Sequence, residues 1–216
     1  MSQNPDYFQM LGLPRRASLA ADEIRQAFQR AAAQSHPDSA PDEPARVERT
    51  ARFQALNEAQ ACLTSAASRL RHILVLEFPD FSAPRGVAMD QAMVDLFTGT
   101  GAAVQAADRW SRKRQAAGSF LAKAALAGEE MAVQEALESA GAALNLALEQ
   151  LEADLVEWDC AMGQATDVER GTAGFLGNAA EVRLAGALHA CAQRVGFLEK
   201  WKARLQSAWT LVFSAG

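Results

Sequence analysis

The sequence is poor in the features that mark disulfide-rich, zinc-binding and membrane-spanning proteins. Its three cysteines, Cys62, Cys160 and Cys191, are far apart and form no CxxC pair, so we expect reduced thiols and neither a zinc ribbon nor a disulfide framework. No apolar run approaches the length of a membrane span, and residues 1–6 lack the basic-then-apolar layout of a signal peptide. These absences predict a cytoplasmic protein with no membrane partner.

The sequence also lacks a dense basic patch and the common catalytic motifs. The chain has 21 basic against 26 acidic side chains, and neither the part up to Asp80 nor the remainder carries a dense basic patch, so we expect no nucleic-acid partner. The histidines, His36, His72 and His189, form no metal-ligand spacing. No P-loop, dinucleotide fingerprint or Ser/His/Asp order is present. We therefore predict that the protein is not an enzyme and holds no metal or cofactor.

What the sequence has in abundance is alanine. Half of its residues are hydrophobic and β-branched residues are few, a composition that favours an all-α fold. In the first 80 residues, apolar side chains recur at helical spacing in four segments. The expected helices are 6–14, stopped by Gly12 and Pro14; one from near Ser18 or Asp22 to about Ser35; 45–64; and 68–78.

A break at 79–86, with two prolines and a glycine, ends this first region. Because such a composition suits a tight connection between domains, it sets the expected boundaries. The predicted organisation is a domain at 1–78, a short linker at 79–86 and a helical bundle at 87–216.

The second region contains the clearest periodicity of the chain. Apolar residues over 128–162 step by alternating fours and threes, which is a heptad seam, and the last helix carries a similar stripe. Two such stripes predict a long antiparallel helical hairpin, although the seam would also allow pairing between two chains. The expected elements are a short helix over 87–97, a turn at Gly99-Thr100-Gly101, a helix over 102–127 weakened at Gly118, a helix over 128–162, a loop over 163–178 and the last helix.

The tripeptide His36-Pro37-Asp38 follows the second expected helix. Proline lacks an amide donor and disfavours helical geometry in the residue before it, so the helix ends here. The face of that helix opposite its apolar stripe carries Arg25 and Arg30. A loop and a second, antiparallel helix come next, so the tripeptide is expected at the tip of a helical hairpin.

These segments resemble the J-domain family. Residues 23–38 (EIRQAFQRAAAQSHPD) and 52–69 (RFQALNEAQACLTSAASR) are similar to its two central helices and the loop between them, and the likeness covers about residues 6–75. The resemblance implies an N-terminal J domain whose antiparallel hairpin presents the His-Pro-Asp loop. It also implies a co-chaperone that binds a DnaK-type heat-shock chaperone and stimulates its ATPase.

The resemblance assigns a chaperone-binding site to His36, Pro37, Asp38, Arg25 and Arg30. The loop tripeptide is the required element in the family, and the positive helix face lies beside it. The residue types suit these roles: Asp38 offers a carboxylate for a bidentate pair with an arginine, and Pro37 limits the loop entropy lost on docking. The two arginines attract an acidic surface and raise the encounter rate.

The sequence departs from the family at several positions. Lysines that are common on the positive helix are replaced here by Gln26, Gln29 and Gln34, which should weaken electrostatic steering. Ser35 stands where the family usually has an aromatic residue before the histidine, and Gln60 stands where the family has a tyrosine in the helix that follows the loop. These two changes cost buried aromatic area.

The overall layout is similar to that of HscB-type J proteins, in which a helical bundle follows the J domain. Segments 6–14, 71–76 and 194–201 carry this likeness, whereas the acidic scaffold-facing segment of that family has no counterpart. The resemblance implies that 87–216 recruits a client, which in that family is an iron–sulfur cluster scaffold. The alternative is a non-catalytic adaptor or structural protein in which a degenerate J fold only mediates assembly.

Overall fold

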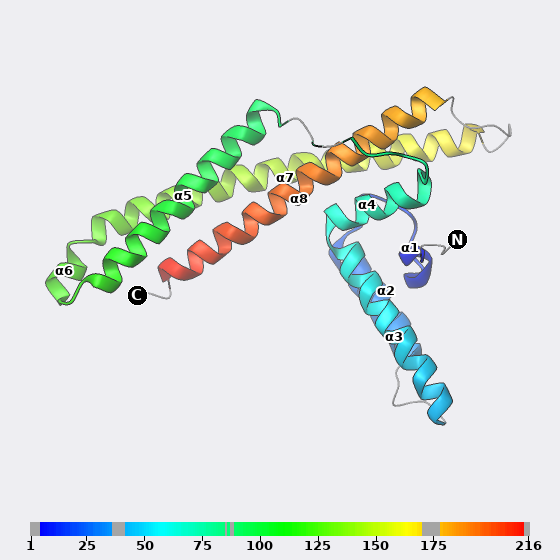
Figure 1. The fold of residues 1–216 in the computed structure, drawn as a ribbon, viewed down its shortest axis with the longest axis horizontal. Coiled ribbons are helices and arrows are strands. Elements are labelled where there is room, and N and C mark those ends of the chain that lie inside the picture. The colour runs from blue at the N-terminus through cyan, green and yellow to red at the C-terminus, as the bar shows by residue number, and fades with distance from the viewer. Residues whose placement is uncertain (1–4, 36–41, 85, 87–88, 170–177, 214–216) are drawn as a thin grey trace. The chain divides into compact units, whose positions relative to one another are not determined.

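The computed structural model describes residues 5–35, 42–84, 86, 89–169 and 178–213, with the side chains of 163–169 and 178–181 left aside. Within these ranges the chain forms helices and loops and no strand, which confirms the all-α prediction (Figure 1). The helices are α1 (Tyr7–Leu11), α2 (Ala21–Gln34), α3 (Glu43–Thr64), α4 (Ala66–Glu77), α5 (Gln91–Ala116), α6 (Phe120–Ala124), α7 (Ala127–Glu169) and α8 (Asn178–Phe213).

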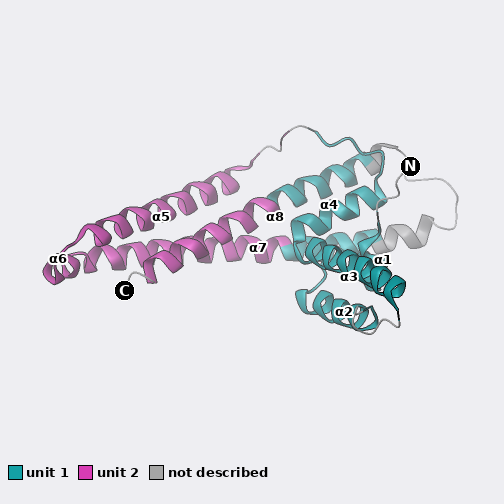
Figure 2. Cartoon of the chain, turned by 60° about the horizontal axis from the view of Figure 1, so that its bottom comes forward, with its two compact units in different colours: residues 1–85, 152–194 teal, residues 86–151, 195–216 magenta. Residues whose placement is uncertain are grey.

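The chain forms two compact units, and the long helices α7 and α8 contribute to both (Figure 2). Unit 1 contains residues 1–85 and 152–194, and unit 2 contains 86–151 and 195–216. The N-terminal helices therefore share a unit with the facing ends of α7 and α8. The boundaries expected at 1–78, 79–86 and 87–216 stay a prediction.

Short polar side chains cap the N-terminal helices of unit 1. Asp6 accepts hydrogen bonds from the amides of Phe8 and Gln9 at the start of α1, and Ser65 accepts one from Ser68 at the start of α4. Gly12 ends α1 with φ at 65°, a left-handed conformation that favours glycine. The predicted stop at Gly12 is thus confirmed, with its conformational cause.

The core of unit 1 is apolar and draws on all of its helices. The stripe predicted for α2 faces inward, because Ile24 and Ala27 are buried and Phe28 is half-buried. From residues 152–194, the C-terminal segment of unit 1, Leu155 of α7 and Leu188 of α8 are buried as well. The other large buried apolar side chains of unit 1 are Phe8, Leu11, Leu13, Leu19, Leu56, Leu63, Leu70, Ile73 and Leu74.

Unit 2 is built from α5, α6 and the remaining parts of α7 and α8. The two long helices run antiparallel within a single chain (Figures 1 and 2), and most residues of the stripes predicted for them are buried or half-buried. Their buried members in this unit are Val133, Leu137, Leu144 and Leu151 on α7 and Val195, Leu198, Leu205 and Val212 on α8. On α5, Met93, Ala103, Ala107 and Trp110 complete the core.

The expected turn at Gly99-Thr100-Gly101 is wrong, because α5 runs through it without interruption. Buried Met93, Thr100, Ala103 and Ala107 continue one inner face across the two glycines. A glycine inside a helix costs only about 1 kcal/mol relative to alanine, so the packing of this face outweighs the local preference. The helix begins at Gln91, where Asp90 accepts a hydrogen bond from the amide of Met93.

Two more helix boundaries were predicted from the sequence, one near Gly118 and one at residue 163. The weak point at Gly118 is confirmed, since α5 ends at Ala116 and α6 starts at Phe120. The loop predicted over 163–178 begins later, because α7 extends to Glu169. Residues 170–177 of that loop lie outside the described ranges.

Candidate functional site

The polar face of α2 is exposed, as the sequence predicts for a docking surface. Arg25 and Arg30 both lie on it. Gln26, Gln29 and Gln34 are exposed on the same helix, at the positions where the family often has lysine. The structure thus brings the two predicted arginines onto one helix, with neutral side chains around them.

The charge of Arg25 is partly balanced by a neighbour on its own helix. Its guanidinium lies 3.0 Å from the carboxylate of Asp22, one turn earlier, and both side chains are more than half exposed. An exposed pair of this kind contributes at most about 1 kcal/mol, so a partner carboxylate can compete for Arg25. The arginine therefore remains suited to an intermolecular ion pair.

The predicted loop residues His36, Pro37 and Asp38 lie outside the described residues, in the stretch of sequence between α2 and α3. On their N-terminal side, Ser35 is 2% exposed, and its hydroxyl has no hydrogen-bond partner among the described residues. On their C-terminal side, Asp42 accepts a hydrogen bond from the amide of Ala45 at 2.9 Å and caps α3. The assignment of the tripeptide to the site stays a prediction.

The platform under the exposed face is a packed pair of helices. The rings of Phe28 on α2 and Phe53 on α3 lie 6.3 Å apart, and Leu56 and Ala59 of α3 are buried. A face held by such packing loses little conformational entropy when a partner binds. The hairpin expected from the sequence is therefore present as α2 and α3.

The loop between α1 and α2 is fixed by two charged side chains, Asp159 and Arg69, which hydrogen-bond to its backbone. Asp159 of α7 accepts hydrogen bonds from the amides of Ala17 and Ser18, at 2.7 and 2.8 Å, and from the Ser18 hydroxyl. On the other side, the buried Arg69 of α4 donates from Nε to the carbonyl of Ala17 at 2.8 Å. Arg69 also donates from Nη1 to the carbonyl of Leu63. This loop leads directly into α2, so the contacts set the position of that helix.

His72 of α4 ties α1 to the same group of helices. Its Nε2 accepts a hydrogen bond from the amide of Tyr7 at 3.1 Å, and its ring stacks on those of Tyr7 and Phe8. Burial lowers the pKa of His72 and the nearby Arg15 lowers it further, against an opposing effect of Asp6. The neutral imidazole is thus the form that this acceptor role requires.

An ion-pair network lies next to His72. Arg15 donates to Asp6 at 2.6 Å and to Glu77 at 2.8 Å, which connects the start of α1 to the end of α4. Burial alone would raise the pKa of Asp6, but hydrogen bonds from Arg15 and from the amides of Gln9 and Phe8 outweigh it and lower that pKa. The network holds the two ends of the first 77 residues together.

Comparison with known proteins identifies this arrangement. The DnaJ domain family model matches residues 6–72. Residues 6–72 are a J domain. Over 72 residues the chain is 36% identical to Chaperone protein DnaJ of Caldicellulosiruptor saccharolyticus, and over 69 residues it is 38% identical to that of Caldicellulosiruptor bescii. These matches cover 33% and 32% of this chain, and the chain spans only 17% and 16% of those two relatives.

The whole chain resembles one solved J protein in fold. Chaperone HscB from Vibrio cholerae superimposes with a TM-score of 0.57 and 16% sequence identity, covering 96% of this chain and 99% of that one. The expected layout, a J domain followed by a bundle with long antiparallel helices, is therefore confirmed. Residues 6–72 thus match the J-domain family, and the chain as a whole has an HscB-like fold.

The residues that hold the J domain in place were not found from the sequence. Arg69 lies within the segment that resembles the family, but its spacing gives no sign that it reaches Ala17, which is 52 residues away. Asp159 falls at a polar position of the α7 heptads, as many solvated residues do. Only the fold shows that both meet the loop before α2.

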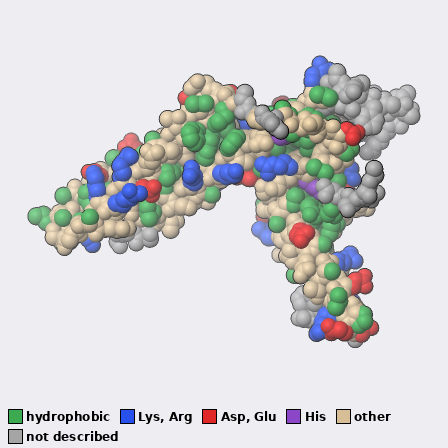
Figure 3. All heavy atoms as spheres, viewed as in Figure 1, with side chains coloured by type: hydrophobic (Ala, Val, Ile, Leu, Met, Phe, Trp, Pro, Cys, Tyr) green, Lys and Arg blue, Asp and Glu red, His purple; other side chains and the backbone are tan. Residues whose placement is uncertain are grey.

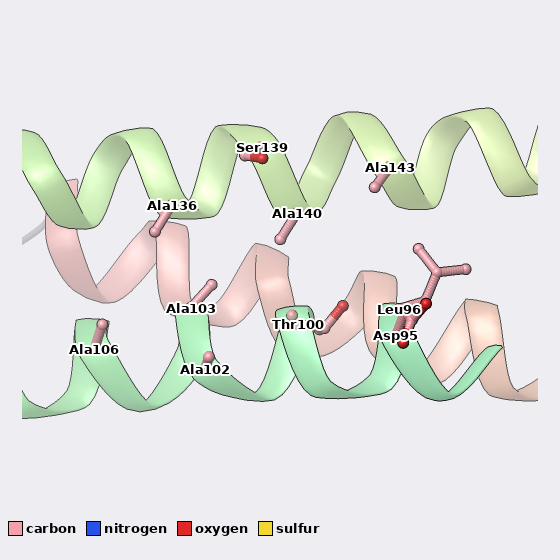
Figure 4. Close-up of a pocket in the computed structure, with 11 residues that line it drawn as sticks. Asp95, Leu96, Thr100, Ala102, Ala103, Ala106, Ala136, Ser139, Ala140 and Ala143 are labelled. Carbon is pink, nitrogen blue, oxygen red and sulfur yellow. The ribbon is translucent and has the colours of Figure 1, made fainter. Parts of the chain in front are cut away.

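A shallow groove between α5 and α7 offers no catalytic constellation. It encloses about 580 Å³, and small side chains such as Ala102, Ala106, Ala136 and Ala140 form most of its lining (Figure 4). Asp95 is the one ionisable side chain among the residues that line it.

Proposed function

We propose that this protein is a co-chaperone that binds a DnaK-type heat-shock chaperone through its J domain and stimulates ATP hydrolysis by that chaperone. The observation that carries the proposal is the exposed arginine-bearing face of α2 within residues that match the J-domain model. The sequence that follows this helix is His36-Pro37-Asp38, the tripeptide that the family requires. The chain acts through docking, so it needs no catalytic residues of its own.

The two arginines give the first test. In single-turnover assays with a DnaK-type chaperone, we expect the full chain to accelerate ATP hydrolysis. An Arg25→Gln/Arg30→Gln double variant should need roughly tenfold more protein for the same acceleration at low salt, because the attraction to an acidic surface is lost. The difference should shrink as salt screens the charges.

The matched control removes two exposed arginines outside the J-domain match. Arg109→Gln/Arg183→Gln changes the net charge equally, and both residues are exposed. We expect this control to behave as the wild type at every salt concentration. Equal behaviour of the α2 variant and the control would remove the arginines from the proposed site, and a wild type that leaves the hydrolysis rate unchanged would contradict the co-chaperone function.

We further propose that unit 2 presents the client-binding surface. Phe97 of α5 is 51% exposed, although its ring lies 5.6 Å from that of buried Trp201 on α8, and Phe197 stacks on the same tryptophan. The neighbouring Val94 is 40% exposed. Exposed aromatic side chains on a rigid apolar base are typical centres of protein interfaces. The HscB-like fold makes an iron–sulfur cluster scaffold the first client to test.

A binding measurement tests this surface. We expect the full chain to bind a purified iron–sulfur scaffold protein in isothermal titration calorimetry, and Phe97→Gln to weaken that binding by roughly tenfold or more. Phe213→Gln is the matched control, because Phe213 is a 63% exposed phenylalanine of the same unit, stacked on Trp209. Binding that Phe97→Gln leaves intact would exclude this surface. A chain that binds no scaffold would leave the J-domain function in place with another client.

A further inference from the structure

We propose that the turn joining α5 to α7 in unit 2 is a docking tip for anionic phospholipid bilayers, with Phe120 and Leu121 of α6 as its inserting side chains. This proposal is independent of the co-chaperone function, because none of its residues belongs to the J domain. We call residues 109–131 the α6 tip. Four features of the α6 tip support the proposal: exposure, order, charge and shape.

Phe120 and Leu121 are the two most exposed large apolar side chains among the described residues. Phe120 is 89% exposed and Leu121 is 79% exposed, and Met131 at the start of α7 is 72% exposed. Isolated exposed leucines are common on soluble proteins, but an adjacent phenylalanine and leucine exposed to this degree leave a large apolar area in water. Transfer of that area to an apolar medium is favourable.

The tip is ordered in a way that holds these side chains out. Ser119 caps α6 by accepting a hydrogen bond from the amide of Ala122 at 3.1 Å. At the base of the turn, Lys113 of α5 pairs with Glu129 of α7 at 2.8 Å, and Arg114 pairs with Glu130 at 3.5 Å. These links close the two helices beneath α6. The exposed pair is therefore presented by a fixed turn.

The charge of the α6 tip opposes that of the whole chain. The α6 tip contains five basic and two acidic side chains, in a protein with a net charge of −5. Arg112 and Lys123 are exposed, and no acidic side chain lies within ion-pair distance of either among the described residues. Positive charge beside an apolar tip is complementary to an anionic lipid surface. Figure 3 shows Lys and Arg side chains beside hydrophobic ones along this end of unit 2.

The shape of the tip favours a bilayer over a protein. Residues 118–125 are all exposed, so Phe120 and Leu121 lie on an exposed turn between two helices. A protein partner would have to supply a matching pocket, whereas a lipid interface admits a protruding apolar pair without shape complementarity. No helix of the described residues is long and apolar enough to cross a membrane. The proposed contact is peripheral, and it stands against the prediction of no membrane partner, which the vesicle experiment tests.

Vesicle co-sedimentation of the full chain tests the proposal. We expect binding to vesicles of equal parts phosphatidylglycerol and phosphatidylcholine, weak binding to phosphatidylcholine alone, and weaker binding as salt rises. A Phe120→Gln/Leu121→Gln variant should lower the partition coefficient by at least about tenfold, because it removes most of the inserted apolar area. Leu146→Gln is the control, since Leu146 is a 65% exposed leucine of α7 in the same unit.

Three outcomes would overturn the proposal. The first is no binding of the wild type to the anionic vesicles, and the second is equal binding by the tip variant, which would reduce the effect to charge alone. The third is self-association without lipid that the tip variant abolishes, measured by analytical ultracentrifugation, which would assign the tip to a second copy of this chain. Unchanged circular dichroism and chaperone stimulation in the tip variant would show that any loss of vesicle binding is specific.

Discussion

A His36→Gln variant is expected to lose the acceleration of ATP hydrolysis that the wild-type chain gives to a DnaK-type chaperone. In the J-domain family the loop tripeptide is the required element, and His36 opens it here. Removal of a residue at the centre of an interface typically costs about 2 kcal/mol or more, which is roughly a thirtyfold loss of affinity. Single-turnover hydrolysis, measured over a range of co-chaperone concentrations, reports this loss directly.

A control substitution lets this experiment distinguish a co-chaperone from an adaptor with a degenerate J fold. His189→Gln is the control substitution, because His189 lies outside the J-domain match, beside Phe81 at a ring distance of 6.0 Å. We expect it to stimulate as the wild type does. If His36→Gln stimulates equally, the tripeptide is not used and the protein is better explained as an adaptor with a degenerate J fold. If it fails while its circular dichroism is unchanged, docking through the loop is supported.

The effect of His36→Gln should exceed that of the α2 arginine variant. Arg25 and Arg30 act mainly on the encounter, so higher protein concentration compensates for their loss. A loop residue that fits a fixed site on the partner acts mainly on the lifetime of the complex, so its loss weakens binding further. Recovery of the stimulation should therefore take roughly thirtyfold more of the His36→Gln variant, against roughly tenfold more of the arginine variant.

Helical periodicity predicted the fold well wherever apolar side chains repeat. The inward stripe of α2 and the facing stripes of α7 and α8 follow from the sequence, because a helix must bury its apolar face. Local preference was less reliable at Gly99 and Gly101, where tertiary packing keeps α5 intact. Periodicity reports which face of a helix is buried, and it does not report how far a weak helical segment is extended by its neighbours.

The candidate site could be found from the sequence only in part. A tripeptide and two arginines that lie close along the chain can be matched to a family pattern. The contacts that position α2 join residues that are far apart, such as Ala17 and Asp159, and nothing in either segment specifies the other. The polar atoms of the Ala17 peptide must find partners somewhere, but the sequence does not say which ones. Such long-range polar contacts appear only once the helices are placed.

Arg69→Met is expected to lower the free energy of unfolding by about 3 kcal/mol, since it leaves two carbonyls in the core without their charged donor. Arg69 is 5% exposed and donates to the carbonyls of Ala17 and Leu63. Methionine preserves much of the aliphatic stem, so the loss reports the hydrogen bonds more than the packing. Urea denaturation followed by far-ultraviolet circular dichroism measures the change. Arg71→Met, at an exposed position of the same helix, should stay within about 0.5 kcal/mol of the wild type.

A double-mutant cycle that combines Arg69→Met with Asp159→Ala shows whether the contacts that α4 and α7 make with the loop before α2 depend on each other. Asp159 binds the amide of Ala17 and Arg69 binds the carbonyl of the same residue. Loss of either side chain frees the loop and weakens the contact made by the other, so the two substitutions should together cost about 1 kcal/mol less than the sum of their separate effects. Additive effects would mean that each side chain stabilises its own segment alone. Coupling would mean that the entry to α2, and with it the chaperone-facing surface, depends on a helix outside the J domain.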